Sequence, residues 1–302
     1  MNGDKGRMKV LSLFDGISCG MVALERAGIP VERYVAYEIE ENAIRISKKN
    51  YPQIEHCGDV SAADFTQYRG FDAIFAGFPC QDLSINKANR QGLKGKRSGL
   101  FWHLVRAIKE VKPKYFLVEN NWKMPGEDLQ IITRELGVEP ILCNSADVSP
   151  QQRYRLIWTN IPVKLPFPKK DIVVADIVQS INGENLISEV RFNGREQCTD
   201  RKNKPVRIGT IGNGGQGERV YSIYGKSVTL KANGGGRGAK TGLYLIYDTV
   251  RKLTPIEAER CQTLPDNYTK LDGISVTNRL KCIGNGWTVD VIAHIFKGLK
   301  EE

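Results

Sequence analysis

A thiol and a carboxylate occupy equivalent positions in two segments of this 302-residue chain. Cys80, preceded by Pro79, comes just after the short apolar run 71–77, and Glu119 comes directly after a second apolar run, 115–118. Runs of this length and composition indicate buried strands, and ligands bind at the carboxyl ends of strands in an open α/β sheet. The pair therefore suggests nucleophilic catalysis with assistance from an acid.

Three earlier apolar runs also end in groups that could bind a ligand. The first leads into Gly16 and Gly20, whose spacing differs from the Gly-x-Gly-x-x-Gly of a dinucleotide site and argues against NAD. Glu38 could accept hydrogen bonds from two ribose hydroxyls, and Asp59 could accept one from an exocyclic amine. Each carboxylate alone could equally be a solvated loop residue. Their occurrence at successive strand ends favours a nucleoside cofactor without a pyrophosphate, namely S-adenosylmethionine.

The elements that must position these residues alternate along the first 160 or so positions. Strands are expected at 9–14, 33–37, 54–57, 71–77, 115–118, 141–143 and 156–159. Helices are expected at 19–27, 41–50, 98–111 and 126–136. This alternation predicts an α/β fold with a doubly wound, mostly parallel sheet of the Rossmann-like kind.

The chain changes character after the last of these strands. Strand-like runs at 221–224 and 227–231 are separated by Gly/Asn turns, which indicates a smaller, β- and loop-rich region. Helical spacing returns after Thr254, which is a suitable cap with Pro255 in the first position. A final helix at 288–299 is expected to pack on the first domain. The predicted organisation is an α/β domain at 1–163, a smaller β- and loop-rich region at 164–250 and a returning C-terminal segment at 251–302.

Most of the formal charge of +10 lies in one segment. Residues 201–240 hold nine Lys/Arg against one acid, Glu218, and ten glycines. A solvated basic face is the ordinary explanation of such a run. Flexible backbone combined with cations and aromatic residues favours loops that lie against a phosphate backbone, so nucleic acid is the expected partner.

The remaining composition narrows the class of protein. Seven scattered cysteines without a C-x-x-C pair, and only three histidines, predict no structural zinc or other metal site and reduced thiols in a cytosolic setting. No apolar stretch is long enough for a membrane span, and no signal peptide is expected at the start.

Five motifs in order give the chain a resemblance to the DNA (cytosine-5) methyltransferases, especially the compact phage and bacterial members. The resemblance extends from Lys9 to the C-terminus. The motifs are Phe14-Asp15-Gly16, Pro79-Cys80-Gln81, Glu119-Asn120, Gln151-Gln152-Arg153-Tyr154-Arg155 and Gly284-Asn285-Gly286-Trp287-Thr288.

The resemblance implies transfer of a methyl group from S-adenosylmethionine to C5 of a cytosine flipped out of duplex DNA. Cys80 would attack C6 and form a covalent adduct, and Glu119 would hydrogen-bond or protonate N3. Arg153 and Arg155, two apart on an extended segment, would face one side, hold the carbonyl edge of the base and orient Glu119. The base that removes the C5 proton is not identified, and water is one candidate. The resemblance also makes 1–163 the catalytic and cofactor-binding domain and 164–250 the target-recognition region. It associates the chain with restriction–modification and with the cytoplasm of a bacterial or phage-infected cell. The size and architecture of the chain allow a monomer, which is the expected state.

Further site residues follow from the same resemblance. Those expected at the cofactor are Phe14, Asp15, Gly16, Gly20, Glu38, Ile39, Asp59, Val60, Pro79, Leu100, Asn285 and Trp287. Those expected at DNA, partly in a cationic lid at 81–98, are Gln81, Ser84, Lys87, Arg90, Arg97, Arg219, Lys231 and Arg237.

Two departures from the family pattern leave more than one hypothesis open. Asn121 stands where the family commonly has valine, with Lys123 close by, and Trp287 follows Gly286 near the end. The first departure could be neutral, or it could adapt the site to a derivative of S-adenosylmethionine that carries an anionic group. Two further hypotheses also stay open, namely the same chemistry on RNA and an inactive homologue that binds DNA.

Overall fold

The computed structural model describes residues 7–79, 92–95, 98–180, 189–195, 199–233 and 237–300. The chain forms two compact units. The first consists of residues 1–143, 154–165 and 292–302, and the second of residues 144–153 and 166–291. The chain thus passes between the units after residues 143, 153, 165 and 291.

A seven-stranded sheet forms the first unit, in the order β3-β2-β1-β4-β5-β7-β6. Strands β1 to β5 pair in parallel and β7 runs antiparallel to β5, so the mostly parallel sheet is confirmed. The strand bounds are β1 Met8–Leu13, β2 Val31–Tyr37, β3 Glu55–His56, β4 Ala73–Ala76, β5 Tyr115–Asn121, β6 Ile141–Asn144 and β7 Tyr154–Thr159.

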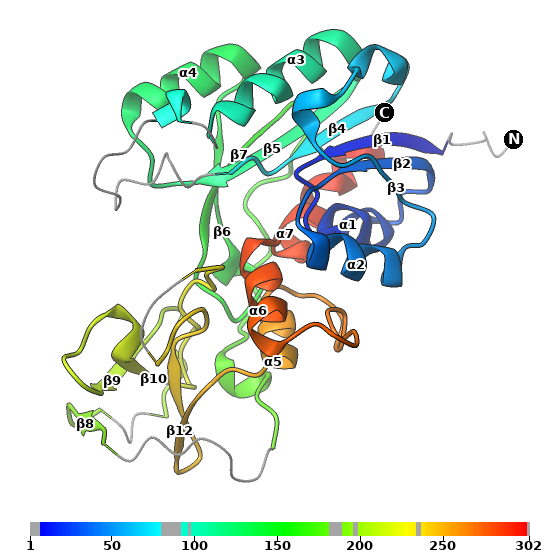
Figure 1. The fold of residues 1–302 in the computed structure, drawn as a ribbon. Coiled ribbons are helices and arrows are strands. Elements are labelled where there is room, and N and C mark those ends of the chain that lie inside the picture. Colours follow the sequence, from blue (N-terminus) through cyan, green and yellow to red (C-terminus); the bar gives the residue numbers. More distant parts are fainter. Residues whose placement is uncertain are drawn as a thin grey trace, which may run out of the picture. The chain divides into compact units, whose positions relative to one another are not determined.

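Helices cover both faces of this sheet (Figure 1). Helices α1 (Cys19–Ala27) and α2 (Glu41–Asn50) lie on one face, and α3 (Phe101–Val111) and α4 (Gly126–Leu136) on the other. The chain winds outward from β1 to β3 in one direction and from β4 to β5 in the other. The carboxyl ends of β1 and β4 therefore mark the point at which ligands bind in doubly wound sheets.

The predicted elements agree well with the observed ones in this unit. Three helices match the expected bounds, and the fourth begins at Phe101 after a short 3-10 turn, Ser98–Leu100. One strand differs in a way that matters for the site. The expected strand at 115–118 continues to Asn121, because β7 pairs with it as far as Asn121 opposite Arg155.

The last helix, α7 (Val289–Phe296), ends in the first unit. The Phe296 ring stacks on Phe75 of β4 at 4.5 Å between centroids, and both side chains are fully buried. Gly298 follows where a Cβ would meet the Pro162 carbonyl oxygen, so the chain passes here too closely for any side chain. The predicted packing of the final helix on the first domain is thus present.

The second unit has a five-stranded sheet in the order β12-β11-β10-β9-β8. Strands β10 and β11 pair in parallel and the other described pairs are antiparallel. The bounds are β8 Arg191–Phe192, β9 Arg207–Thr210, β10 Arg219–Ser222, β11 Leu243–Ile246 and β12 Thr249–Lys252, followed by α5 Pro255–Cys261 and α6 Val276–Asn285.

Two expectations for this unit need correction. Residues 227–231 form no regular strand, because their backbone N–H groups do not all bond to a neighbouring strand. The Ser227 N–H donates to the Pro150 carbonyl, and the Leu230 N–H donates to the Gln151 side chain. The expected division of the chain also differs from the observed units. Ala258 of α5 and Ile283 of α6 belong to the same buried cluster as Tyr244 of β11, and only residues 292–302 of the predicted returning segment cluster with the first unit.

Within the described part of the chain, no helix is both long and apolar enough to cross a membrane.

Candidate active site

An ion pair marks the carboxyl end of β5. Arg155 Nε lies 2.6 Å from Glu119 Oε1, and the two side chains are 20% and 12% exposed. Antiparallel pairing of β5 with β7 brings the two residues together, since Asn121 lies opposite Arg155. Arg155 also donates from Nη1 to the Tyr154 carbonyl at 2.7 Å. The carboxylate is therefore held in one orientation at the sheet edge while part of its surface remains open.

The residue after this carboxylate ties β5 to the turn that leads to the predicted nucleophile. Asn120 is 2% exposed, and its Nδ2 donates to the Phe78 carbonyl at 3.0 Å. Its Oδ1 accepts from the Asn121 backbone N–H at 2.7 Å. Sequence reasoning gave Asn120 no role of its own. The sequence signal that could have indicated this role is a second polar residue just after the apolar run 115–118.

The predicted nucleophile and several predicted DNA contacts lie outside the described residues. These are Cys80, Gln81, Ser84, Lys87, Arg90 and Arg97. Pro79, the last described residue before this gap, is half-buried and follows the carboxyl end of β4. Because β4 and β5 are adjacent parallel strands, their chains leave the sheet at the same edge.

Arg153 lies in surroundings unlike those of Arg155. It is 3% exposed within the second unit. Its guanidinium donates to the backbone carbonyls of Leu230, Gly284 and Gly286 at 3.0–3.2 Å. Arg153 precedes β7, so strand alternation does not apply to it, and the shared environment predicted from the two-residue spacing is not observed.

A buried polar network surrounds Arg153. Gln151 Nε2 donates to the Gln262 side chain at 3.0 Å and to the Cys261 carbonyl at 3.2 Å. Gln262 donates in turn to the Ile283 and Gly286 carbonyls, and Thr288 donates to Gln262 Oε1 at 2.7 Å. The Gln-x-Arg part of the motif is thus built into the interior of the second unit.

The loop after β1 has an unusual backbone. Phe14, Gly16 and Ser18 all have positive φ, at 58°, 61° and 60°. Only glycine adopts this region without steric cost, so the two other residues store strain. Such clustering is typical of loops whose shape a ligand requires.

Glu38, at the end of β2, fastens this loop. Its Oε2 accepts from the Gly16 backbone N–H, and its Oε1 accepts from Ile39 and Glu40, all at 2.8 Å. A carboxylate has about four acceptor positions, so roughly one remains for a ligand. With these three backbone bonds in place, Glu38 can accept a hydrogen bond from one ribose hydroxyl, whereas two were expected.

Asp15 points into the protein. It accepts hydrogen bonds from Ser12, Ser18 and Tyr34 at 2.5–2.8 Å. Burial raises the pKa of its carboxyl, and these three hydrogen bonds oppose that shift. The side chain fixes the loop, and the backbone around it is what a ligand could meet.

Asp59 is exposed at the end of β3. Its Oδ1 accepts from the Ser61 backbone N–H at 2.8 Å, and that bond lowers the carboxyl pKa. A hydrogen bond from the Ser61 side chain lowers the pKa further, so Asp59 stays ionised near neutral pH. Ile39 is 72% exposed beside Glu38 and offers an apolar surface to a flat ring.

These residues fit a nucleoside cofactor: an acceptor for a ribose hydroxyl, an acceptor for an amine and an apolar contact at neighbouring strand ends. The other predicted cofactor residues of the first unit are a buried Gly20 and Val60 and a half-buried Leu100. In the second unit, Asn285 is exposed and Trp287 is half-buried. The described residues contain no group of three or more His, Cys, Asp or Glu side chains that could hold a metal ion.

Lys123, at the first departure from the motif, lies against an aromatic ring. Lys123 Nζ lies 5.0 Å from the centre of the Trp122 ring, and that ring lies 5.3 Å from the Tyr154 ring. The cation of Lys123 is thus stabilised by an aromatic face.

Two of the predicted DNA-binding cations lie together in the second unit. Arg219 Nε is buried and has no hydrogen-bond partner among the described residues. Burial lowers the pKa of Lys231, and the positive charge of Arg219 adds to this effect. An anionic ligand would give the Arg219 Nε–H an acceptor and would reduce the repulsion between Arg219 and Lys231. Arg237 is exposed.

Sequence comparison places the chain among proteins of one kind. A family described as C-5 cytosine-specific DNA methylase matches residues 8–301. The Type II methyltransferase M.HhaI of Haemophilus parahaemolyticus is 28% identical over 309 residues, which cover 95% of this chain and 93% of that protein. The Type II methyltransferase M.NlaX of Neisseria lactamica is 27% identical over 313 residues, 97% and 96% of the two chains.

Solved structures share the fold. The Entamoeba histolytica methyltransferase EhMeth matches with a TM-score of 0.73 at 16% identity, over 98% of this chain and 99% of that one. The Dnmt2 methyltransferase of S. pombe matches with a TM-score of 0.68 at 16% identity, over 98% and 99%.

Proposed function

Because this chain belongs to the C-5 cytosine-specific DNA methylases, we propose that its sheet edge methylates cytosine with Cys80 as the nucleophile and Glu119 as the acid. The protein is a DNA (cytosine-5-)-methyltransferase, and its methyl donor is S-adenosylmethionine. The proposal concerns the residues that perform the reaction and the form in which DNA is bound. The Glu119–Arg155 ion pair, next to the strand that leads to Cys80, is the observation that carries it.

The chemistry requires a nucleophile because C5 of cytosine is too weak to attack a methyl sulfonium. Addition of the Cys80 thiolate to C6, with a proton or hydrogen bond from Glu119 at N3, turns the ring into an enamine whose C5 is nucleophilic. After C5 takes the methyl group, loss of the C5 proton to a base and departure of the thiolate restore the aromatic ring. The target carbon is inaccessible within a duplex, so the base must leave the stack first.

Arg155 and Asn120 support the two reacting groups. Arg155 fixes the orientation of Glu119, and its position suits a contact with the carbonyl edge of the base. Asn120 holds the Phe78 carbonyl, and with it the segment that follows β4 as far as Pro79. We assign Arg153 to the support of the second unit and not to the base, because its guanidinium is bound by three backbone carbonyls.

The cofactor residues follow from the strand ends. Glu38 and Asp59 would accept from the ribose and the adenine amine, and Ile39 would contact the adenine ring. When bound, S-adenosylmethionine supplies an electrophilic methyl group on sulfur. The strained loop around Gly16, already fastened by Glu38, needs little reorganisation to receive a ligand.

Duplex DNA would lie against the second unit. Arg219 and Lys231 are paired cations without a described counter-ion, and Arg237 is an exposed third. We further propose that the protein acts as a monomer in the cytoplasm of a bacterial or phage-infected cell, which agrees with its bacterial relatives. Sedimentation of the purified protein with and without a short duplex tests the monomer.

One experiment tests the assignment of the nucleophile. The protein is incubated with S-adenosylmethionine labelled in the methyl group and duplex DNA of mixed sequence. We expect label at cytosine C5 with the wild-type protein and none with Cys80→Ser. Cys57→Ser, at an exposed thiol of the first unit, is the matched control and retains transfer. Label at C5 from Cys80→Ser would overturn the assignment.

A further inference from the structure

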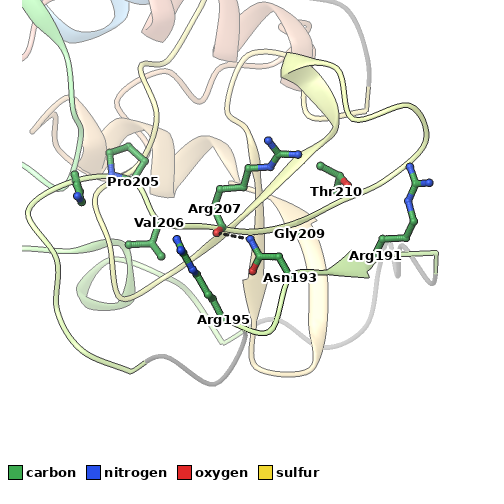
Figure 2. A pocket seen from close by; sticks show the side chains of 9 residues that line it. Arg191, Asn193, Arg195, Pro205, Val206, Arg207, Gly209 and Thr210 are labelled. Carbon is green, nitrogen blue, oxygen red and sulfur yellow. Dashed lines mark hydrogen bonds between the residues drawn. The ribbon is translucent and has the colours of Figure 1, made fainter.

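A basic groove lies along β8 and β9 of the second unit, separate from the predicted DNA contacts at Arg219, Lys231 and Arg237 (Figure 2). Its volume is about 470 Å³. The lining residues are Arg191, Asn193, Arg195, Lys204, Pro205, Val206, Arg207, Gly209 and Thr210. Four of these are cations and none is an acid, so the groove presents charge of a single sign.

The four cations are exposed, and no carboxylate in the described segments lies within ion-pair distance of them. Nearby Arg201 shows the contrast. Its guanidinium pairs with Asp171 at 3.0 Å and with Asp176 at 2.6 Å. The groove therefore concentrates positive charge that no carboxylate among the described residues neutralises.

Contacts that do not involve Arg195, Lys204 or the Arg207 guanidinium hold the groove in shape. The Asn193 backbone N–H donates to the Ile208 carbonyl at 2.9 Å, and Asn193 Nδ2 donates to the Arg207 carbonyl at 3.1 Å. At Gly209 a Cβ would lie 2.9 Å from the Arg191 carbonyl oxygen, so only glycine lets β8 approach β9 this closely. Figure 2 shows the side chains of Arg191, Arg195 and Arg207 at three separate positions around the groove.

The groove borders the glycine-rich loop before β10. Arg191 donates to the Gly212 carbonyl, and a Cβ at Gly214 would lie 3.9 Å from the Arg207 guanidinium. The groove is therefore continuous with the segment expected to face DNA. Arg191 and Arg195 lie outside the basic segment 201–240 and extend the positive surface beyond it.

We propose that this groove binds backbone phosphates of duplex DNA at positions outside the recognition sequence and so contributes affinity that does not depend on sequence. The inference rests on the proposed binding of duplex DNA by the second unit. Guanidinium groups match phosphate oxygens in a bidentate geometry, and phosphate contacts position a protein without reading bases. The lining is open and its cations are solvent-exposed, which suits a repeating chain of phosphates better than the enclosure of one small nucleotide.

The test uses a duplex of dA·dT, which contains no cytosine and so no target. The variant combines Arg195→Gln with Lys204→Gln, which remove two positive charges and leave polar, flexible side chains. Each phosphate contact contributes about 0.9 to the slope of log K against log salt. We expect the slope of the variant to be smaller by about 1.8 for two lost contacts, with weaker dA·dT binding at low salt.

Arg201→Gln is the matched control, because it removes a cation that is already paired with two aspartates. It should leave the salt slope unchanged. Methyl transfer by the wild-type protein to cytosine-containing duplex DNA is measured in parallel. Its absence would reject the proposed function, whereas an unchanged salt slope rejects only the role of the groove. A cooperative thermal transition in each of the three proteins confirms that all are folded.

Two results would overturn the inference. The first is an unchanged salt slope for the double variant on dA·dT. The second is saturable binding of ATP, used as a free polyphosphate probe, that the variant loses while its duplex binding is unaffected. That outcome would make the groove a nucleotide site.

Discussion

The two units use their arginines and carboxylates in opposite ways. At the sheet edge of the first unit, Glu119 and Arg155 form one ion pair and remain partly exposed. In the interior of the second, Arg251 forms a bidentate ion pair with Glu257, with both hydrogen bonds at 2.8 Å. The Glu257 side chain is 0% exposed and the Arg251 side chain is 7% exposed. Charged groups with free positions can act on a substrate, whereas buried groups bound on all sides hold the chain together. Burial and remaining hydrogen-bond capacity, more than residue type, separate catalysis from support.

The largest expected effect tests the catalytic side of this contrast. Glu119→Gln keeps the shape of the side chain and removes its ability to donate a proton. Loss of a general acid typically lowers a rate by about 10²–10⁴-fold, and we expect that decrease in single-turnover methyl transfer. The thermal midpoint should stay near that of the wild type, because the carboxyl group is partly exposed. A variant that turns over normally would show that Glu119 is not the acid.

The second prediction concerns the supporting side. Arg153→Met should lower the free energy of unfolding by about 2–6 kcal/mol, since the Leu230 and Gly284 carbonyls lose this donor and each buried carbonyl left without one costs about 1–3 kcal/mol. The Gly286 carbonyl keeps the donor from Gln262. Denaturant unfolding measures the loss. Arg153→Lys should recover part of it, and Arg155→Met, two residues away, should lose much less. Equal losses at the two positions would remove the distinction between them.

A third, smaller effect is expected at the cofactor end. Glu38→Ala removes the acceptor for the ribose and the anchor of the loop at Gly16. Hydrogen bonds to charged groups contribute about 1.5–3 kcal/mol, so the Kd for S-adenosylmethionine, measured by calorimetry, should rise by roughly 10–100-fold. Glu32→Ala, an exposed acid of the same strand, should bind as the wild type does. Unchanged affinity in Glu38→Ala would exclude Glu38 from the cofactor site.

The smallest effect involves the exposed pair of Arg201 and Asp176. The Arg201 guanidinium lowers the pKa of Asp176 below its ordinary value of 3.8. A carboxyl whose pKa is lower in the folded state stabilises above the unfolded pKa and loses that contribution as pH falls through the folded value. Arg201→Gln should therefore be slightly less stable than the wild type at pH 7. The difference should shrink as pH falls below 3.8 and disappear once the pH is below the lowered pKa of folded Asp176. A difference that persists under acid conditions would contradict the assignment.

The sequence predicted the first unit well because its signals are local. Helix α1 ends at Gly28 and α4 at Gly137, both with positive φ, so periodicity and glycine together mark the bounds. The sheet edge and its acids followed from where apolar runs stop. Cys80 lies outside the described residues, so its place at this edge stays a prediction.

The second unit was predicted less well because distant groups decide its structure. Residues 227–231 contain Val228 and Thr229, which favour strands, yet their backbone is bound by the Gln151 segment. Arg153 is bound by carbonyls far along the chain at Leu230 and Gly284. Nothing local in the sequence indicates such partners, and spacing alone placed Arg153 beside Arg155.

The stacking of Phe296 on Phe75 bears on how the protein is made. The strand that carries Phe75 is synthesised early, but the ring that covers it arrives only when almost the whole chain has been translated. Contacts between such distant positions slow folding, so the nascent sheet must wait with one face incompletely covered while the second unit is produced. The first unit is completed only by residues that are synthesised last. We therefore expect the nascent chain to be prone to aggregation and to need chaperones until the last helix docks.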